Sequence, residues 1–198
     1  MPRPKSDTRQ RLLHAAMHLF WENGYAATGM AGLLKKANAN SGSFYYFFES
    51  KEDLLRAVLD EYLENLEPVV VRPVLQTTPD PLERIFGILA GYRAKLLGTD
   101  CTYGCPIGRL ALEIDPADKR AFKKIATNFD AWVGVIARLL EDLRDRLPRG
   151  ANPRELAQFV LVTMEGGVML SRAHRSIEPF DAAVRQLRNY FALLMKRV

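Results

Sequence analysis

The side chains best suited to contact a partner through hydrogen bonds are concentrated in the stretch SGSFYYF, residues 41–47. Its hydroxyl groups both donate and accept, and the first acidic residue after them is Glu49. A short helix with such a face can enter the major groove of DNA and contact base edges. Because the stretch has no Arg or Lys, it cannot make the common bidentate contact to guanine. Base readout is therefore expected to depend on the hydroxyl side chains of Ser41, Ser43, Tyr45 and Tyr46.

The second candidate for chemistry is a pair of cysteines, Cys101 and Cys105, in the run DCTYGCPIGR. Pro106 is typical of the first residue of a helix, which places Cys105 at the helix start. Unpaired backbone N–H groups and the helix dipole stabilise a thiolate there, whereas Cys101 in the preceding loop should titrate as an ordinary cysteine. Two interpretations remain open: Cys105 is a reactive sensor thiol, or it is a small cysteine packed at a helix start.

Other chemistry has little support in the residue pattern. The histidines His14, His18 and His174 do not form a ligand cluster, and the two thiols alone underfill a tetrahedral metal site. A peroxidatic enzyme using Cys105 would need an activating group, and only Arg109 lies near it in the sequence. We therefore predict no metal, no cofactor and no enzymatic activity.

Two short helices joined by a tight turn are predicted to position the hydroxyl-rich stretch. Asn38 falls where the turn needs a left-handed residue, and Asn tolerates that conformation. Asn40 can cap the second helix through its side-chain oxygen. The spacing of apolar residues predicts the buried faces of a helix-turn-helix, with inward positions Leu33, Ala37, Ala39, Phe44 and Phe47.

The rest of the chain is also predicted to be helical, giving an all-α protein of about nine helices. Asp80-Pro81, Asp115-Pro116 and Asn152-Pro153 each combine an N-cap residue with Pro at the first helical position. The segment PVVVRPVLQTTP, residues 68–79, is expected to be a connector between the two halves rather than a strand. We divide the chain into a DNA-binding domain, residues 1–50, and a larger domain, residues 51–198. The expected helices elsewhere span residues 7–23, 50–68, 81–97, 116–147, 153–174 and 180–198, with another beginning at Pro106.

Charge placement agrees with a DNA-binding role for the first quarter of the chain. The net charge is +5, and residues 1–48 contain six Lys or Arg against two Asp or Glu. Such an excess would neutralise DNA phosphates. No apolar run is long enough to span a bilayer, and the basic N-terminus leads into an amphipathic helix rather than a signal-peptide core. We therefore expect a cytoplasmic protein, in which a constitutive disulfide is disfavoured.

Residues 8–54 resemble the DNA-binding domain of the tetracycline-repressor (TetR) family. The resemblance is carried by Thr8-Arg9, Leu13, Ala15-Ala16, Leu19-Phe20, Gly24-Tyr25, Thr28, Gly42-Ser43, Tyr45, Phe48 and Ser50-Lys51-Glu52-Asp53-Leu54. The family usually has Ala at Leu34 and Gly at Asn38. The resemblance implies a ligand-responsive transcriptional regulator, most simply a repressor of a palindromic operator. Its DNA-binding set is Thr28, Met30, Asn40, Ser41, Gly42, Ser43, Tyr45, Tyr46 and Lys51, with Thr28, Gly42 and Lys51 expected to position phosphates.

For the second domain, the resemblance implies an effector pocket and a homodimer formed by the last two helices. Candidate effector-binding residues are Tyr62, Phe86, Cys105, Phe129, Trp132 and Met164, and candidate dimer residues are Gly166, Gly167, Leu187 and Phe191. The two glycines allow either close approach of a partner helix, or room for a ligand, or a kink. The run at Cys105 also resembles the Gly-Cys-Pro-x-Gly stretch of a TetR subgroup, some members of which respond to electrophiles. That subgroup commonly has Asn at the position of Arg109, so the effector is not implied.

Overall fold

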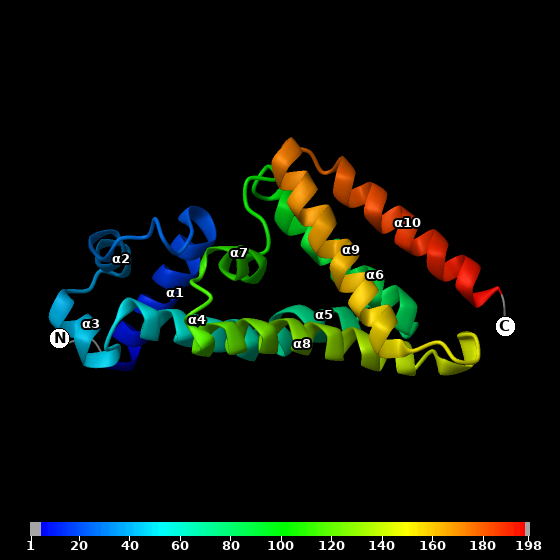
Figure 1. Ribbon diagram of the computed structural model, residues 1–198, viewed down its shortest axis with the longest axis horizontal. Helices are drawn as coiled ribbons and strands as arrows, with labels where there is room; N and C mark the ends of the chain where they lie inside the picture. The colour runs from blue at the N-terminus through cyan, green and yellow to red at the C-terminus, as the bar shows by residue number, and fades with distance from the viewer. Residues whose placement is uncertain (1–4, 197–198) are drawn as a thin grey trace. The chain divides into compact units, whose positions relative to one another are not determined.

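The computed structural model describes residues 5–196, which form ten α-helices and no β-strand (Figure 1). The all-α prediction is confirmed. Within the same residues, no helix combines the length and apolar character needed to cross a membrane. The helices are α1 (Lys5–Asn23), α2 (Met30–Ala37), α3 (Ser41–Phe47), α4 (Lys51–Asn65), α5 (Arg72–Leu75), α6 (Pro81–Leu97), α7 (Pro106–Glu113), α8 (Lys119–Glu141), α9 (Pro153–His174) and α10 (Glu178–Met195).

The chain forms two compact units. The first contains the residues up to Glu64 together with Pro106–Asn128, and the second contains Asn65–Cys105 and the residues from Phe129 onward. Helix α8 contributes to both units, and α7 packs with the N-terminal helices although it is far from them in sequence. A functional boundary at residue 50 stays a prediction.

The first unit is built around the predicted helix-turn-helix. Leu33, Ala37 and Phe44 are buried, as expected from their spacing. Ala39 and Phe47 are only half-buried, contrary to the prediction. The backbone becomes extended at Phe48, which turns that ring inward and leaves it 3% exposed. The buried face of this domain therefore includes the residue that follows α3.

The segment predicted to be a connector is mostly helical, whereas the helices predicted from the sequence leave residues 69–79 outside them. After α4 the chain continues through a π-helical turn, Leu66–Val71, and then α5. Only residues 76–80 are non-helical before α6. A wider π turn accommodates the ring of Pro68, which would otherwise clash with the carbonyl four residues earlier.

The predicted start of the long helix at Pro116 is also wrong, because a different residue caps it. Asp118 Oδ1 accepts a hydrogen bond from the Ala121 N–H at 3.0 Å, and α8 begins at Lys119. Asp115 instead closes the preceding turn on Ala117 N–H at 2.8 Å. The helix ends at Glu141, and a 3-10 turn, Arg144–Arg146, follows it.

The other two helix starts are confirmed. Helix α6 begins at Pro81 after Asp80, whose side chain accepts a hydrogen bond from Leu82 N–H at 2.8 Å. Helix α9 begins at Pro153 after Asn152, which caps Arg154 N–H at 3.0 Å. Pro at the first position loses no helical hydrogen bond there.

In the second unit, α9 and α10 form an antiparallel hairpin (Figure 1). Arg175 ends α9 in a left-handed conformation, and the buried Ser171 hydroxyl accepts a hydrogen bond from Phe180 N–H at 3.0 Å. Two ion pairs hold α10 on α6: Arg93 with Asp181 at 2.7 Å and Arg188 with Glu83 at 2.5 Å. The contact between α6 and α10 is therefore stabilised by ion pairs.

Candidate nucleic-acid interface

Helix α3 is placed by the turn before it, as the sequence predicts. Asn38 adopts the left-handed conformation, with φ 47° and ψ 54°. The Asn40 side chain accepts a hydrogen bond from the Ser43 N–H at 2.7 Å. Arg11 braces the same turn from α1, donating to the Ala37 carbonyl at 3.0 Å and to the Asn38 carbonyl at 3.4 Å. Analysis of the sequence missed this role of Arg11, because a basic residue on an amphipathic helix normally indicates a solvated face.

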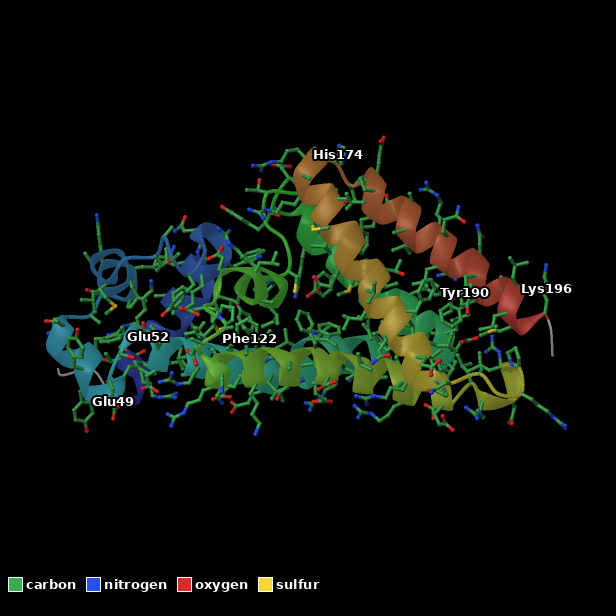
Figure 2. The ribbon with its side chains drawn as sticks, in the orientation of Figure 1. Glu49, Glu52, Phe122, His174, Tyr190 and Lys196 are labelled. Carbon is green, nitrogen blue, oxygen red and sulfur yellow. The ribbon has the colours of Figure 1, made fainter. Side chains whose placement is uncertain are left out.

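The outer face of α3 presents polar and aromatic groups without a carboxylate. Tyr45 and Tyr46 are 63% and 64% exposed, and Ser41 and Gly42 are also exposed. Ser43 is half-buried, so it is less available than expected. The first acidic side chains after α3, Glu49 and Glu52, lie around the start of α4 (Figure 2). The arrangement is suited to a groove of DNA lined by base edges.

Thr28 has an internal role rather than the predicted contact with a phosphate. Its side chain is 3% exposed, and its hydroxyl donates to the Gly24 carbonyl at 2.6 Å. Its backbone N–H is bonded to the Tyr25 carbonyl at 3.2 Å. Since both donors are used within the loop, Thr28 fixes the entry into α2. Met30, also predicted to contact DNA, is half-buried at the first position of that helix.

Lys51 lies in the first turn of α4, and its ammonium group faces Tyr25. Nζ donates to the Tyr25 carbonyl at 2.6 Å and lies 4.2 Å from the centre of the Tyr25 ring. Burial lowers the pKa of Lys51, and burial together with the Glu52 carboxylate raises the pKa of Tyr25. One of the three ammonium hydrogens is used in this way, so the group keeps donors for a phosphate.

Helix α7 holds the end of α1 through an ion pair that the sequence analysis did not find. Arg109 Nη1 donates to the carbonyls of Trp21 and Glu22, each at 3.1 Å. Arg109 Nε pairs with Glu113 Oε1 at 2.6 Å, and Glu113 Oε2 accepts the Tyr25 N–H at 2.7 Å. The pair satisfies backbone groups that a helix end leaves unbonded. Its only signal in the sequence is an Arg and a Glu four residues apart.

Gly24 is closely enclosed by this pair, and we expect Gly24→Ala to destabilise the protein. Gly24 has φ +89°, and an added Cβ would lie 2.4 Å from Glu113 Oε1. The strained backbone and the displaced carboxylate should lower the free energy of unfolding by about 1–3 kcal/mol. Urea denaturation measures this value. Gly91→Ala, within α6 and with nothing within 4 Å of the added Cβ, is the control and should not lower this value, because Ala favours a helix interior over Gly. Equal effects of the two substitutions would contradict the assigned role of Gly24.

The predicted effector residues are distributed over both compact units. Tyr62 belongs to the first unit, where its hydroxyl donates to the Met17 carbonyl at 3.3 Å. In the second unit, Phe86 contacts Phe191 edge-to-face and carries the Arg188 guanidinium over its ring at 3.9 Å. Trp132 and Met164 are buried, and Phe129 is half-buried. Phe86 and Phe191 thus form the core between α6 and α10.

The surroundings of Cys105 contain a second polar group, Glu165. The thiol is 6% exposed, and the Tyr92 hydroxyl donates to its Sγ at 3.7 Å. The Glu165 carboxyl also shares a hydrogen bond with this thiol, while burial raises the pKa of Glu165. Glu165 Oε1 is fully enclosed and has no hydrogen-bond partner in the described part of the chain. Whether Cys105 is a reactive thiol stays a prediction.

The expectation that Cys101 titrates as an ordinary cysteine is wrong. Its side chain is 3% exposed, and its backbone adopts a left-handed conformation with φ 53°. Burial and the neighbouring Asp100 raise the pKa of the Cys101 thiol. A thiolate at this position is therefore disfavoured. Across residues 5–196, no group of three His, Cys, Asp or Glu side chains is placed to hold a metal ion.

Three of the four predicted dimer residues are used within the chain itself. Leu187 and Phe191 are buried, and a Cβ at Gly167 would lie 3.2 Å from the Phe180 ring. Gly166 differs, because nothing lies within 4 Å of its Cβ direction. It falls in an exposed apolar row of α9 with Phe159, Val162 and Met169, whose helical spacing puts them on one face.

Helix α10 continues this surface. Tyr190, labelled in Figure 2, is 40% exposed and contacts the Phe159 ring with 5.2 Å between centroids. Leu193, about one turn further along α10, is 63% exposed, and Val162 on α9 is 69% exposed. We call this surface the hairpin face and define it by Phe159, Val162, Gly166, Met169, Tyr190 and Leu193. Exposed apolar side chains gathered on one helical hairpin are typical of an interaction site.

Comparisons with known proteins agree with both parts of the chain. Residues 12–58 match the family model for bacterial regulatory proteins of the tetR family, and residues 81–186 match the C-terminal domain of LmrA/YxaF-like transcriptional regulators. An uncharacterized HTH-type transcriptional regulator of Mycobacterium tuberculosis is 30% identical over 91% of this chain and 92% of its own. The HTH-type transcriptional repressor DhaR of Mycobacterium sp. strain GP1 is 26% identical over 89% and 88%. The crystal structure of a TetR regulator from Chloroflexus aurantiacus superposes with a TM-score of 0.82 at 27% identity, covering 95% of this chain and 96% of the other.

Proposed function

Because this chain belongs to the TetR family of bacterial transcriptional regulators, we propose that it is a homodimeric repressor released from its operator by a small-molecule effector. The observation that carries the proposal is the capped, carboxylate-free face of α3, with Tyr45 and Tyr46 exposed. DhaR, a relative over most of the chain, is named a repressor. We assign no chemical reaction to the protein, and we place it in the cytoplasm with the DNA that it binds.

The two parts of the chain have separate tasks in this proposal. Residues 1–50 bind DNA, and residues 51–198 bind the effector and form the dimer. Ser41, Tyr45 and Tyr46 read bases, and the N-terminal ends of α3 and α4, with Gly42 and Lys51, hold phosphates. A dimer presents two copies of α3, which match half-sites about one DNA turn apart, roughly 34–36 Å.

The hairpin face is the proposed dimer interface. Its apolar row on α9 has an open position at Gly166, where a partner helix can approach closely. A twofold dimer uses the same surface on both chains, so each exposed side chain of the row becomes buried on both protomers. This assignment keeps the predicted pair of helices and replaces Gly167, Leu187 and Phe191 with exposed residues of the same helices.

For the effector we propose contact with the polar group of Tyr92, Cys105 and Glu165, beside Trp132. The Tyr92 and Trp132 rings meet edge-to-face, with 5.7 Å between centroids. Covalent modification of Cys105 by an electrophile is the second candidate signal, since the thiol already accepts a hydrogen bond from Tyr92. Added bulk there would act at the start of α7, whose Arg109 and Glu113 hold the end of α1.

The test begins with DNA fragments selected by the full-length protein from a random pool, which should contain a palindrome. The double substitution Tyr45→Ala/Tyr46→Ala should then weaken binding to that palindrome by about 100-fold or more, because each dimer loses four contacting rings. The thermal midpoint should stay unchanged, since both rings are mostly exposed. Fluorescence anisotropy measures affinity, and calorimetry measures the midpoint.

The control is Val69→Ala/Leu112→Ala, which removes two exposed apolar side chains outside both α3 and the hairpin face. Its affinity is compared at protein concentrations where it is shown to be dimeric, and it should then bind the operator as the wild type does. A selected pool without any palindrome would contradict binding by a dimer. Unchanged affinity in Tyr45→Ala/Tyr46→Ala would contradict readout by α3.

A further inference from the structure

A basic pocket in the first unit has no part in the function proposed above. It is a cavity of about 450 Å³ between α4 and the first turns of α8, the helix on which Figure 2 labels Phe122. This volume lies in the range of small-molecule sites. Its lining residues are Arg56, Asp60 and Leu63 on α4, and Arg120, Lys123, Lys124, Thr127 and Asn128 on α8.

Charge in the pocket is strongly unbalanced. Four cationic side chains face one carboxylate, Asp60, which pairs with Lys124. Arg56 is shared between Asp53 at 3.6 Å and Asp118 at 3.9 Å. Arg120 and Lys123 have no ion-pair partner among the residues that the structure describes. Two cations therefore remain available for an anion.

The location of these cations is unfavourable for the protein alone. Arg120 and Lys123 lie in the first two turns of α8, where the helix dipole is positive. The N-cap carboxylate of Asp118 is the acidic group at this helix start, and it is already bonded to Ala121 N–H and paired with Arg56. A cation near a helix N-terminus is disfavoured, whereas an anion is favoured there. A bound anion would remove this penalty and bridge α8 to Arg56 on α4.

The pocket also contains a buried polar side chain, Asn128, held in a fixed orientation. Asn128 is 3% exposed, and its amide donates to the Leu59 carbonyl at 2.9 Å and to the Lys124 carbonyl at 3.0 Å. Both amide hydrogens are thus used, which fixes the side chain and leaves its carbonyl oxygen as an acceptor. An acceptor beside cations fits a ligand that has hydroxyl groups as well as negative charge. Leu63 supplies an apolar wall.

We propose that this pocket binds a small hydroxyl-bearing organic phosphate, with Arg120, Lys123 and Arg56 on the phosphate and Asn128 on a hydroxyl. Guanidinium and ammonium groups form charge-assisted hydrogen bonds with phosphate oxygens. The buried amide of Asn128 and the apolar wall of Leu63 favour such a ligand over the backbone of DNA, which is bound mainly through its charge. The site is separate from the polar group around Cys105, which belongs to the other compact unit.

The experiment uses ribose 5-phosphate as the probe and the full-length protein without DNA. Isothermal titration calorimetry at low salt should detect binding of ribose 5-phosphate, weaker binding of inorganic phosphate and no binding of ribose. Arg120→Gln/Lys123→Gln should weaken ribose 5-phosphate binding by about tenfold or more, since each charged hydrogen bond contributes about 1.5–3 kcal/mol. Circular dichroism verifies that the variant is folded.

The matched control is Arg138→Gln/Arg149→Gln, which removes the same charge outside the pocket and should bind the probe as the wild type does. Absence of probe binding at millimolar concentration, or equal weakening in the control, would overturn the site. Equal affinity for inorganic phosphate and ribose 5-phosphate would overturn the role of Asn128. A lower salt dependence of operator binding in Arg120→Gln/Lys123→Gln, without probe binding, would assign these cations to DNA instead. None of these outcomes depends on whether α3 reads the operator.

Discussion

Val162→Glu/Met169→Glu should convert the protein from a dimer to a monomer. Both residues lie in the hairpin face, 69% and 61% exposed, so the free chain tolerates a carboxylate at either position. In a twofold dimer the two substitutions place four carboxylates in an apolar interface, and each costs at least about 1–3 kcal/mol to bury. The dissociation constant of the dimer should rise by about 1,000-fold or more.

Sedimentation equilibrium gives the association state, and anisotropy gives the affinity for the operator. A monomer presents one α3 to a palindrome, so we expect operator affinity to fall together with association. The matched control is Val69→Glu/Leu112→Glu, which adds the same charge at side chains that are 60% and 86% exposed away from the hairpin face. This control should remain dimeric. A dimeric Val162→Glu/Met169→Glu protein would show that the hairpin face has another partner.

The dimer residues illustrate what periodicity in a sequence leaves undecided. An apolar helix in a hairpin has one face against its neighbour and can have a second face outside. Gly166 and Gly167 are adjacent, yet Gly167 contacts Phe180 and Gly166 is open. The 100° rotation per residue that separates them cannot be oriented until the neighbouring helix is known. Periodicity therefore identified the two helices of the hairpin, but the predicted dimer residues on them face mostly inward.

Local capping was predictable because its chemistry acts over a few residues. Asn38 and Asn40 have the predicted conformations and contacts, and Pro81 and Pro153 begin their helices as expected. The helix start predicted at Asp115-Pro116 was wrong because a second acceptor, Asp118, lies three residues later and caps the helix instead. Two caps in competition cannot be ranked without the packing of the helix that follows.

Contacts between distant segments were not predictable in this way. Arg109 and Glu113 are more than 80 residues from the backbone groups that they bind at the end of α1 and in the loop that follows it. Lys51 was placed at the right helix end, but its approach to Tyr25 depends on a loop that folds against α4. The buried neighbourhood of Cys105 likewise includes Glu165, which in the sequence looks like an ordinary helical glutamate.

Glu165→Gln should stabilise the protein above neutral pH. The enclosed Oε1 has no partner in the described residues, and burial raises the pKa of the carboxyl group. For a carboxyl whose folded pKa is raised, the ionised form is less favourable in the folded chain than in the unfolded chain. Wild-type stability is therefore lost as pH increases from the ordinary Glu range, about 4.3, through the raised folded value.

The neutral amide of Gln removes this dependence while keeping the size of the side chain. At pH 8 the free energy of unfolding should increase by about 1.4 kcal/mol for each unit by which burial raises the folded pKa, because the amide carries no charge to desolvate. The gain should shrink as pH falls toward 4. Urea denaturation across this pH range is the measurement, and Glu64→Gln, at an exposed helical position, is the control. A gain that is the same at every pH would contradict the burial penalty.

The same substitution tests the thiol beside it. A carboxylate next to Cys105 opposes formation of a thiolate through like-charge repulsion, and an amide does not. In a Cys101→Ser background, iodoacetamide should therefore modify Cys105 severalfold faster at pH 8 when Glu165 is replaced by Gln. Operator release measured on the same samples connects this reaction to function. Release that follows the faster modification would support Cys105 as the sensor, whereas full modification with the operator still bound would leave Cys105 as a packed residue at the start of α7.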